Sequence, residues 1–181
     1  MVTPLFIAVQ RFDPSDGEKW ESYVRFAKIP GLVEVVSLDM LVCPRLIQEF
    51  CDEDWDHLVN EDFRIAYFYH LDYLLERVQN VSRRNILGVY RNPERHIACA
   101  PAPGDFAFVG YDLIEEQTQI SALTNCGGFP DVFQNEELNR FGLIDGFDRA
   151  NEVRRLLAGR HPEEPHAQCE LYALWRLNEA V

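Results

Sequence analysis

The residues with the clearest potential for nucleophilic chemistry lie in a short loop, Cys126-Gly127-Gly128. A thiolate beside the backbone amides of a Gly-Gly turn is stabilised, and the same amides can hold an oxyanion. Such chemistry needs a base: His161 and His166 are the candidates, and Asp131 is the residue that could orient the base. The commoner role of such a loop is structural, with glycine supplying a positive φ angle and the cysteine packed beneath the turn. The sequence leaves both interpretations of the loop open.

Two His-x-x-Cys pairs have the ligand types of a zinc site. They are His96 with Cys99 and His166 with Cys169, and a tetrahedral zinc ion takes four such N and S ligands. Residues three apart on a strand point to opposite faces, however, and neither pair has a glycine turn that would bring its members together. We therefore expect buried cysteines, exposed loop histidines and no cofactor, with structural zinc as a minor alternative.

The densest acidic run of the chain surrounds a tryptophan. It comprises Asp52, Glu53, Asp54, Trp55, Asp56 and His57. The run lacks the glycine-containing spacing of a calcium loop, so a calcium site is not indicated. Carboxylates around an exposed tryptophan are typical of the rim and the anchor of a protein interface. The commoner role of such a run, and the one that we expect here, is a solvated helix end with Trp55 packed inward.

The chain as a whole is strongly acidic, with 30 Asp and Glu residues against 17 Lys and Arg and a formal net charge of −13. The acidic residues are spread along the whole length, which leaves no basic face for a phosphate backbone and disfavours direct nucleic-acid binding. In most proteins such a charge serves solubility. The more specific interpretation is an acidic face that binds a protein partner with a basic surface.

The cysteines and the apolar runs favour a cytoplasmic protein. Five cysteines without a regular spacing, in a chain long enough to build its own core, indicate reduced thiols. The N-terminal residues carry no basic segment of a signal peptide, and no apolar run approaches the ~18 residues of a membrane span. We therefore expect no membrane association.

The loop at Cys126 follows two β-like runs that we predict to form a hairpin. Residues 104–114 and 118–125 have the composition of strands and flank a polar turn, which would present the glycine loop at a sheet edge. Residues 32–42 suit either a strand or the start of a helix. Further strands are predicted at Leu5–Phe12, Asn85–Tyr90 and Gln168–Leu177.

Apolar residues at helical spacing predict three main helices. The first covers the region Trp20–Ala27, and the third begins at Asp145 and runs through Leu157. The second is predicted to be the longest, roughly five turns from Asn60 to Val78, and to lie on the sheet. Its apolar stripe consists of Phe63, Tyr67, His70, Leu71, Leu74 and Val78.

These elements predict one α+β domain over residues 1–181. Strands cluster with turns, and helices are interspersed without a regular βαβ rhythm. We expect a mostly antiparallel sheet of about five strands, with helices packed mainly on one face.

No catalytic signature accompanies this fold. The sequence has no Gly-x-Gly-x-x-Gly or phosphate loop, no Gly-x-Ser-x-Gly elbow and no His-Glu-x-x-His motif. The leading hypothesis is a non-catalytic regulatory protein that binds a macromolecule through an acidic face, as an inhibitor or immunity protein would bind a basic toxin or nuclease. A small enzyme or small-molecule binder centred on Cys126 is the alternative, and a structural zinc protein is a third.

Overall fold

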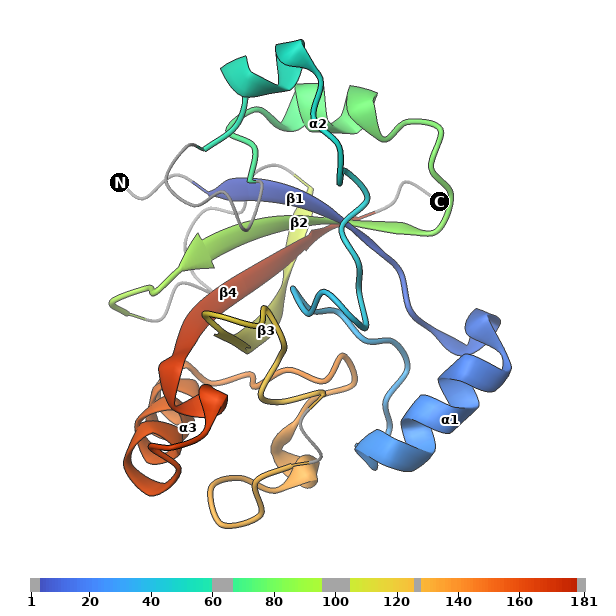
Figure 1. The fold of residues 1–181 in the computed structure, drawn as a ribbon. Coiled ribbons are helices and arrows are strands. Elements are labelled where there is room, and N and C mark those ends of the chain that lie inside the picture. The colour runs from blue at the N-terminus through green and yellow to red at the C-terminus, as the bar shows by residue number, and fades with distance from the viewer. Residues whose placement is uncertain (1–3, 60–66, 96–104, 126–127, 179–181) are drawn as a thin grey trace.

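One antiparallel sheet organises the part of the chain that the computed structural model describes, residues 4–59, 67–95, 105–125 and 128–178 (Figure 1). Within these residues the sheet has four strands in the order β1-β2-β4-β3. The strands are β1 (Leu5–Gln10), β2 (Arg84–Arg91), β3 (Phe106–Glu115) and β4 (Cys169–Leu177). The α+β class with a mostly antiparallel sheet is confirmed, and the expected strand number is close to the observed one.

Two buried clusters, one on each face of the sheet, form the core. On the first face Ala8 lies opposite Ile86. On this face α2 (Leu71–Arg77) packs beside β1, and α3 (Phe147–Arg160) packs over β3 and β4. The second face, which includes Val9 and Leu174, is covered by α1 (Glu18–Ala27) and by residues 35–43. Because both faces are covered, β2 is buried continuously from Asn85 to Tyr90 instead of alternating between core and solvent.

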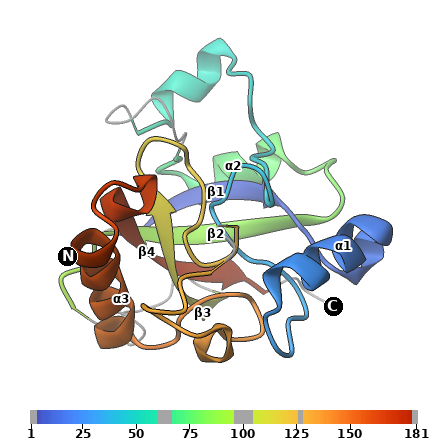
Figure 2. The same ribbon diagram turned by 60° about the horizontal axis from the view of Figure 1, so that its bottom comes forward.

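The helices differ in their position around this sheet. In the turned view of Figure 2, α1 and α3 lie on opposite sides of the molecule, and the turn of residues 52–56 projects away from both. Short 3-10 helices complete the described secondary structure: η1 (Pro14–Asp16), η2 (Asp52–Asp56), η3 (Asn135–Glu137) and η4 (Pro165–Gln168).

Short backbone contacts cover both outer strands of the sheet. On the free side of β1, Phe6 exchanges two backbone hydrogen bonds of 2.9 and 2.8 Å with Phe68, and Val9 forms a bridge with Arg45. On the free side of β3, Tyr111 pairs with Ile144. Unpaired strand edges invite pairing with other chains, so these contacts protect the sheet at the positions they occupy.

The predicted hairpin of residues 104–114 with 118–125 is correct only in its first half. β3 pairs along its length with β4, and residues 118–125 contribute a single bridge between Ile114 and Ser121 before turning away. The polar side chains of Ser121 and Asn125 point into the protein and bond to buried carboxylates, as described below. These bonds hold the segment in a turn and end the strand pairing.

The predicted long helix from Asn60 to Val78 is correct at Leu71–Arg77 and wrong at residues 67–70, where the described chain is not helical. Only Leu71–Arg77 is helical, while Phe68 is extended and forms bridges with Phe6 and Leu58. An aromatic residue suits a strand as well as a helix. Here the backbone N–H and C=O of Phe68 form hydrogen bonds with Phe6 at the outer edge of β1, so Phe68 is extended and not helical. Asn60 and Phe63 lie outside the described residues.

The remaining predicted elements are confirmed with small changes. β1, β2 and β4 occupy the three other predicted strands, and α3 buries Ala150, Val153 and Leu157 as expected. α1 is present, whereas residues 32–42 form neither strand nor helix beyond one bridge between Val35 and Phe12.

Candidate functional site

The acidic run forms a turn that one buried carboxylate holds in place. Asp54, in η2, points inward and is fully buried. Its oxygens accept hydrogen bonds from Arg77 Nε at 2.7 Å and Nη2 at 2.8 Å, and Oδ1 also accepts from the Tyr73 hydroxyl at 2.7 Å. The backbone amide of Cys51 donates to the same carboxylate at 2.8 Å. The Arg77 guanidinium holds the pKa of Asp54 well below its usual range, so Asp54 stays ionised and anchors the turn to α2.

The outer side of the same turn exposes aromatic and acidic side chains together. Trp55 is 47% exposed and Phe50 is 37% exposed, and their ring centroids lie 5.8 Å apart. Asp52, Glu53 and Asp56 are exposed around them. We call these five residues the acidic–aromatic patch. The expectation that Trp55 packs inward is therefore wrong.

His57 belongs to the support of this patch. Its ring stacks on Tyr73 with a centroid distance of 3.7 Å and an interplanar angle of 4°. Its Nδ1 lies 2.8 Å from Nδ1 of His70, at the start of α2, so the two rings share one hydrogen bond. Since Tyr73 also bonds to Asp54, the end of η2 and the first turn of α2 are connected twice.

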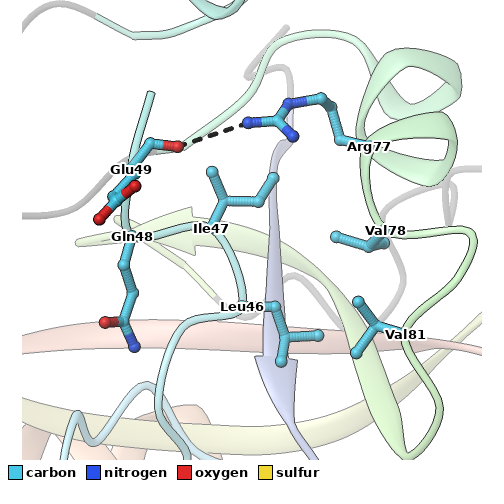
Figure 3. A pocket seen from close by; sticks show the side chains of 7 residues that line it. All are labelled: Leu46, Ile47, Gln48, Glu49, Arg77, Val78 and Val81. Atoms are coloured by element: carbon cyan, nitrogen blue, oxygen red, sulfur yellow. Dashed lines mark hydrogen bonds between the residues drawn. The ribbon is translucent and has the colours of Figure 1, made fainter. Parts of the chain in front are cut away.

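A surface groove of about 320 Å³ adjoins the patch (Figure 3). It lies between residues 46–49, which lead into Phe50, and the end of α2. Arg77 Nη2 reaches across it to the backbone carbonyl oxygen of Glu49 at 3.4 Å. The lining side chains are Leu46, Ile47, Gln48, Glu49, Arg77, Val78 and Val81.

Two residues of the predicted catalytic group are brought together. Nε2 of His161 lies 2.9 Å from a carboxylate oxygen of Asp131, the pairing expected of a base and its orienting residue. Phe129 lies between the two candidate bases, with ring centroids 5.2 Å from His161 and 4.7 Å from His166. The predicted nucleophile, Cys126, lies outside the described residues, as does Gly127, whereas Gly128 has a positive φ of 91°.

Glu115 is a residue of this region that the sequence did not indicate. It is buried at the end of β3, and its carboxylate faces Nδ1 of His166 and accepts a hydrogen bond from the Thr118 hydroxyl. Burial lowers the pKa of His166. Glu115 follows the apolar residues of β3, and an acidic residue at the end of a strand is usually exposed to solvent. Its position in the sequence therefore does not predict the buried contact with His166.

The zinc hypothesis receives no geometric support from its described members. Cys169 is buried in β4, and burial raises the pKa of its thiol to about 12, whereas His166 faces Glu115. The other two proposed ligands, His96 and Cys99, lie outside the described residues. In the part of the chain that is described, no three His, Cys, Asp or Glu side chains gather in a way that could hold a metal ion.

A second group of carboxylates lies inside the molecule. The carboxylate of Asp112 in β3 accepts hydrogen bonds from the hydroxyls of Ser37 at 2.5 Å and Ser121 at 2.7 Å. Asp39 accepts from the backbone amide of Ser121 at 2.8 Å and from the Asn125 side chain at 3.0 Å. Both carboxylates are fully buried, and together they join residues 37–43 and 119–125 to the sheet.

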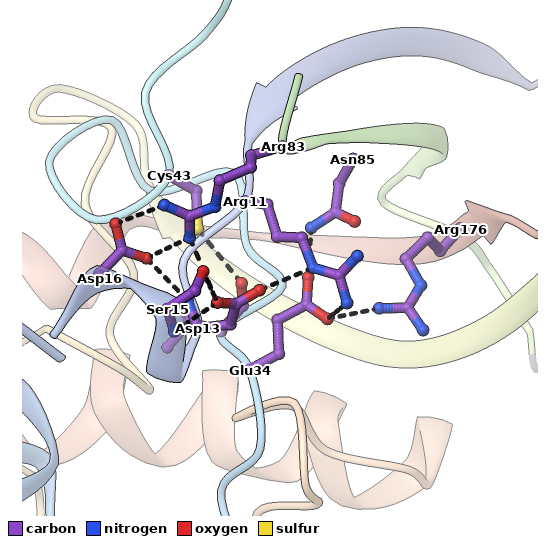
Figure 4. A network of polar contacts seen from close by, with 10 residues as sticks. Arg11, Asp13, Ser15, Asp16, Glu34, Cys43, Arg83, Asn85 and Arg176 are labelled. Carbon is purple, nitrogen blue, oxygen red and sulfur yellow. Dashed lines mark hydrogen bonds and ion pairs between the residues drawn. The ribbon is translucent and has the colours of Figure 1, made fainter. Parts of the chain in front are cut away.

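A third polar group connects the start of the chain to the far end of the sheet (Figure 4). The buried carboxylate of Glu34 accepts hydrogen bonds from Asn85 at 2.7 Å and Arg176 at 2.8 Å. Charges alternate along this group in the order Asp16, Arg83, Asp13, Arg11, Glu34 and Arg176. Its members neutralise one another, so we assign it to the packing of residues 11–34 on the sheet.

None of the described helices combines the length and the apolar character that crossing a bilayer requires. Comparison with protein-family models, with curated proteins and with solved structures finds no significant match to this chain. The geometry of the described residues therefore carries the functional proposal.

Proposed function

We propose that this protein is a non-catalytic regulator that binds a basic protein partner through the acidic–aromatic patch. One observation carries the proposal: Trp55 and Phe50 are exposed side by side in a turn whose other exposed side chains include three carboxylates. Large exposed aromatic residues surrounded by charge are typical of interface anchors with a polar rim.

The support beneath the patch favours binding over simple solubility. Asp54 is paired with Arg77 and Tyr73, so the turn is fixed before any partner arrives. A fixed surface loses less conformational entropy on association than a mobile one. The outer strands are covered at Phe6 and Tyr111, which favours recognition by side chains over addition of a strand.

The chemistry of the patch is suited to lysine and arginine. A cation placed over the face of a tryptophan is attracted by the ring, and neighbouring carboxylates add charge-assisted hydrogen bonds. The net charge of −13 would also accelerate the approach of a basic partner at low ionic strength. It would oppose binding to a nucleic-acid backbone, which we propose is not a direct partner.

The proposal is tested by affinity capture from native lysate with matched variants. The test variants are Asp52→Asn with Asp56→Asn, and Trp55→Ala; Asp54 is left intact because it holds the turn. The control is Glu18→Gln with Glu21→Gln, which removes the same charge from α1. We expect basic proteins to be captured by the wild type and the control and to be lost from both test variants. Equal capture by all four proteins would contradict the proposal.

A second candidate function is catalysis or small-molecule binding at the loop of Cys126. The observation in its favour is the contact between His161 and Asp131, with Phe129 between the two histidines. Its test is the rate of alkylation of Cys126 against pH, in the wild type and in His161→Gln. A thiol that reacts as an ordinary cysteine with a pKa near ~8.5 in both proteins would contradict this function.

We also propose that the protein acts in the reducing cytoplasm and apart from membranes. The odd number of cysteines supports this, as do the free thiols of Cys43, Cys51 and Cys169. Thiol titration of the protein isolated without reductant tests it, and a disulfide-linked product would contradict it.

A further inference from the structure

The two histidines that support the patch share a hydrogen bond that depends on where their protons lie. Nδ1 of His57 and Nδ1 of His70 are 2.8 Å apart, and the two rings are inclined at 82°. A neutral imidazole carries a proton on one nitrogen and a lone pair on the other, so one of these Nδ1 atoms donates and the other accepts. The bond therefore requires one protonated and one unprotonated Nδ1.

Only the doubly charged form of the pair is incompatible with this geometry. One added proton leaves one Nδ1 as an acceptor and makes the hydrogen bond charge-assisted, which strengthens it. A second added proton places an N–H group on both Nδ1 atoms, so no acceptor remains and two positive rings face each other. The rings must then move apart.

The pair lies where η2 meets α2. His57 directly follows η2, its backbone amide donates to the carbonyl oxygen of Asp54 at 2.9 Å, and its ring is stacked on Tyr73. His70 directly precedes α2 and is exposed, so its ring can rotate away without disturbing the core. Separation of the two rings therefore removes one of the contacts that hold the turn of Trp55 on α2.

The other charged groups of this support do not respond to the same pH range. The hydrogen bonds from Arg77 hold the pKa of Asp54 well below its usual range, and they raise the pKa of Arg77. Burial, together with the bond to Asp54, raises the pKa of Tyr73. All three groups keep one protonation state between about pH 5 and 8, where imidazole ordinarily changes its charge.

The remaining titratable side chains beside the pair belong to classes that titrate outside this range. Asp56 and Asp72 are carboxyls and Tyr69 is a phenol, each close to one of the two histidines in the chain. Cys51 is a thiol whose Sγ lies 4.0 Å from the hydroxyl of Tyr73. Free carboxyls ordinarily titrate below about pH 5, and thiols and phenols above about pH 8. Among the described residues around the pair, the two imidazoles are therefore the groups that sense this range.

We infer that the His57–His70 pair is a pH-sensitive link that holds the acidic–aromatic patch in place at neutral pH and loosens it in acid. The linked rings exclude the second proton and the separated rings accept it, so a falling pH favours separation. The consequence for a partner rests on the proposed function. A basic partner meets a fixed patch at neutral pH and a looser one in acid, where ordering the patch costs more and binding is weaker.

Acrylamide quenching of tryptophan fluorescence measures the release of the turn. It reports mainly on Trp55, which is 47% exposed, because Trp20 is 7% exposed and Trp175 is 4% exposed. We expect quenching of the wild type to increase as the pH falls from about 8 to about 5. Quenching that stays constant over this range would overturn the inference.

Two substitutions of His70 separate the link from general effects of acid. His70→Asn presents an amide that can either donate to Nδ1 of His57 or accept from it, so a link persists in both protonation states. His70→Ala removes the link. We expect both variants to lose the pH response, and we expect His161→Gln, the control at the end of α3, to retain it. A wild-type response in His70→Ala would overturn the inference.

An oligolysine peptide is the probe for the effect on binding, followed by its protection of Trp55 from acrylamide. Between about pH 8 and about pH 5 we expect the affinity of the wild type to fall about fivefold more than that of His70→Asn, as for one hydrogen bond. Equal losses in the two proteins would overturn the effect on the partner.

The two proposals fail in different ways. If Trp55 responds to pH but the peptide does not protect it at neutral pH, the proposed function is overturned and the link stands. If the peptide protects Trp55 but quenching of the free protein does not change with pH, the link is overturned and the proposed function stands.

Discussion

The buried carboxylates of Asp39 and Asp112 and the exposed carboxylates of Asp52 and Asp56 are the same chemical group in opposite surroundings. Asp112 is enclosed by two serine hydroxyls and two backbone amides, and Asp39 accepts hydrogen bonds from three backbone amides and from Asn125. The side chains of Asp52 and Asp56, which precede and follow Trp55 in the sequence, are exposed to solvent. In the first region the protein supplies the donors; in the second, water does.

This difference separates carboxylates that stabilise the fold from those free to meet a partner. A buried carboxylate is tolerated only when its hydrogen bonds are complete, and its removal leaves the donors around it unsatisfied. A solvated carboxylate adds little to stability and exchanges water for a cation at little cost. Asp54 lies between the two cases, because it is buried but serves the exposed turn.

The largest expected effect comes from removing a buried carboxylate. Asp39→Ala leaves the amides of Leu41, Val42 and Ser121 without their acceptor, and we expect a loss of about 4 kcal/mol in the free energy of unfolding. Urea unfolding followed by circular dichroism measures it. A loss below about 1 kcal/mol would show that water replaces the carboxylate, and the contrast between the two regions would fail.

The pH dependence of stability tests the same contrast through Asp112. Burial raises the pKa of this carboxyl to about 6 from the ordinary 3.8. Between these values the folded protein keeps a proton that the unfolded chain releases, so this group contributes a stability that declines as pH rises from about 4 to 6. The total change is about 3 kcal/mol.

Comparison with Asp112→Asn isolates this contribution, since asparagine does not titrate. We expect the stability of the variant relative to the wild type to increase as pH rises through this window and to stay constant above about pH 7. Unfolding in urea at a series of pH values provides the measurement. A difference that does not change between about pH 4 and 7 would mean that burial does not raise the pKa of Asp112.

An intermediate effect is expected at Asp54. Asp54→Ala removes the partner of Arg77 and Tyr73, but the Arg77 side chain is partly exposed and can be solvated, so we expect a loss of about 1–2 kcal/mol. The same variant should also release η2 from α2 and shift the fluorescence of Trp55. Asp52→Ala serves as its control on the same turn, and equal stability of the two variants would remove the distinction between them.

The smallest effect on stability should accompany the largest effect on binding. Asp52→Asn with Asp56→Asn is expected to change the free energy of unfolding by less than about 0.5 kcal/mol, because both side chains are exposed. Loss of partner capture by this variant at unchanged stability would sharpen the assignment of roles. A large loss of stability would show that these carboxylates support the fold.

The sequence predicted correctly those helices and strands whose structure follows from their own hydrophobic pattern and does not depend on a distant partner. The apolar face of Ala150, Val153 and Leu157 specifies α3 because it has the helical period and one buried side. The apolar run before Leu177 specifies β4, which is buried on both faces from Leu171 to Trp175. The run at Phe68 was misassigned because its aromatic residues suit either structure, and the choice fell to a backbone partner on β1 distant in the sequence.

Some features of the candidate site were likewise predictable from the sequence, and others depend on contacts between distant segments. The sequence identified an acidic run around a tryptophan, and it named His161 and Asp131 as a candidate base and its orienting residue, which are in contact. Which carboxylates of the turn face inward is not encoded in their spacing: Asp54 differs from Asp52 and Asp56 because Arg77 and Tyr73, on α2, donate hydrogen bonds to it. The groove and the contact of Glu115 with His166 likewise join segments far apart in the chain.

The sequence by itself determined an acidic α+β protein with its main strands. Net charge follows from composition, and the hydrophobic pattern of each strand is set by residues that are neighbours in the chain. The tertiary structure alone decided which acidic residues are structural and which are exposed, because that depends on donors brought from distant segments. The exposed face of Trp55 was decided in the same way, by the anchoring of its turn to α2.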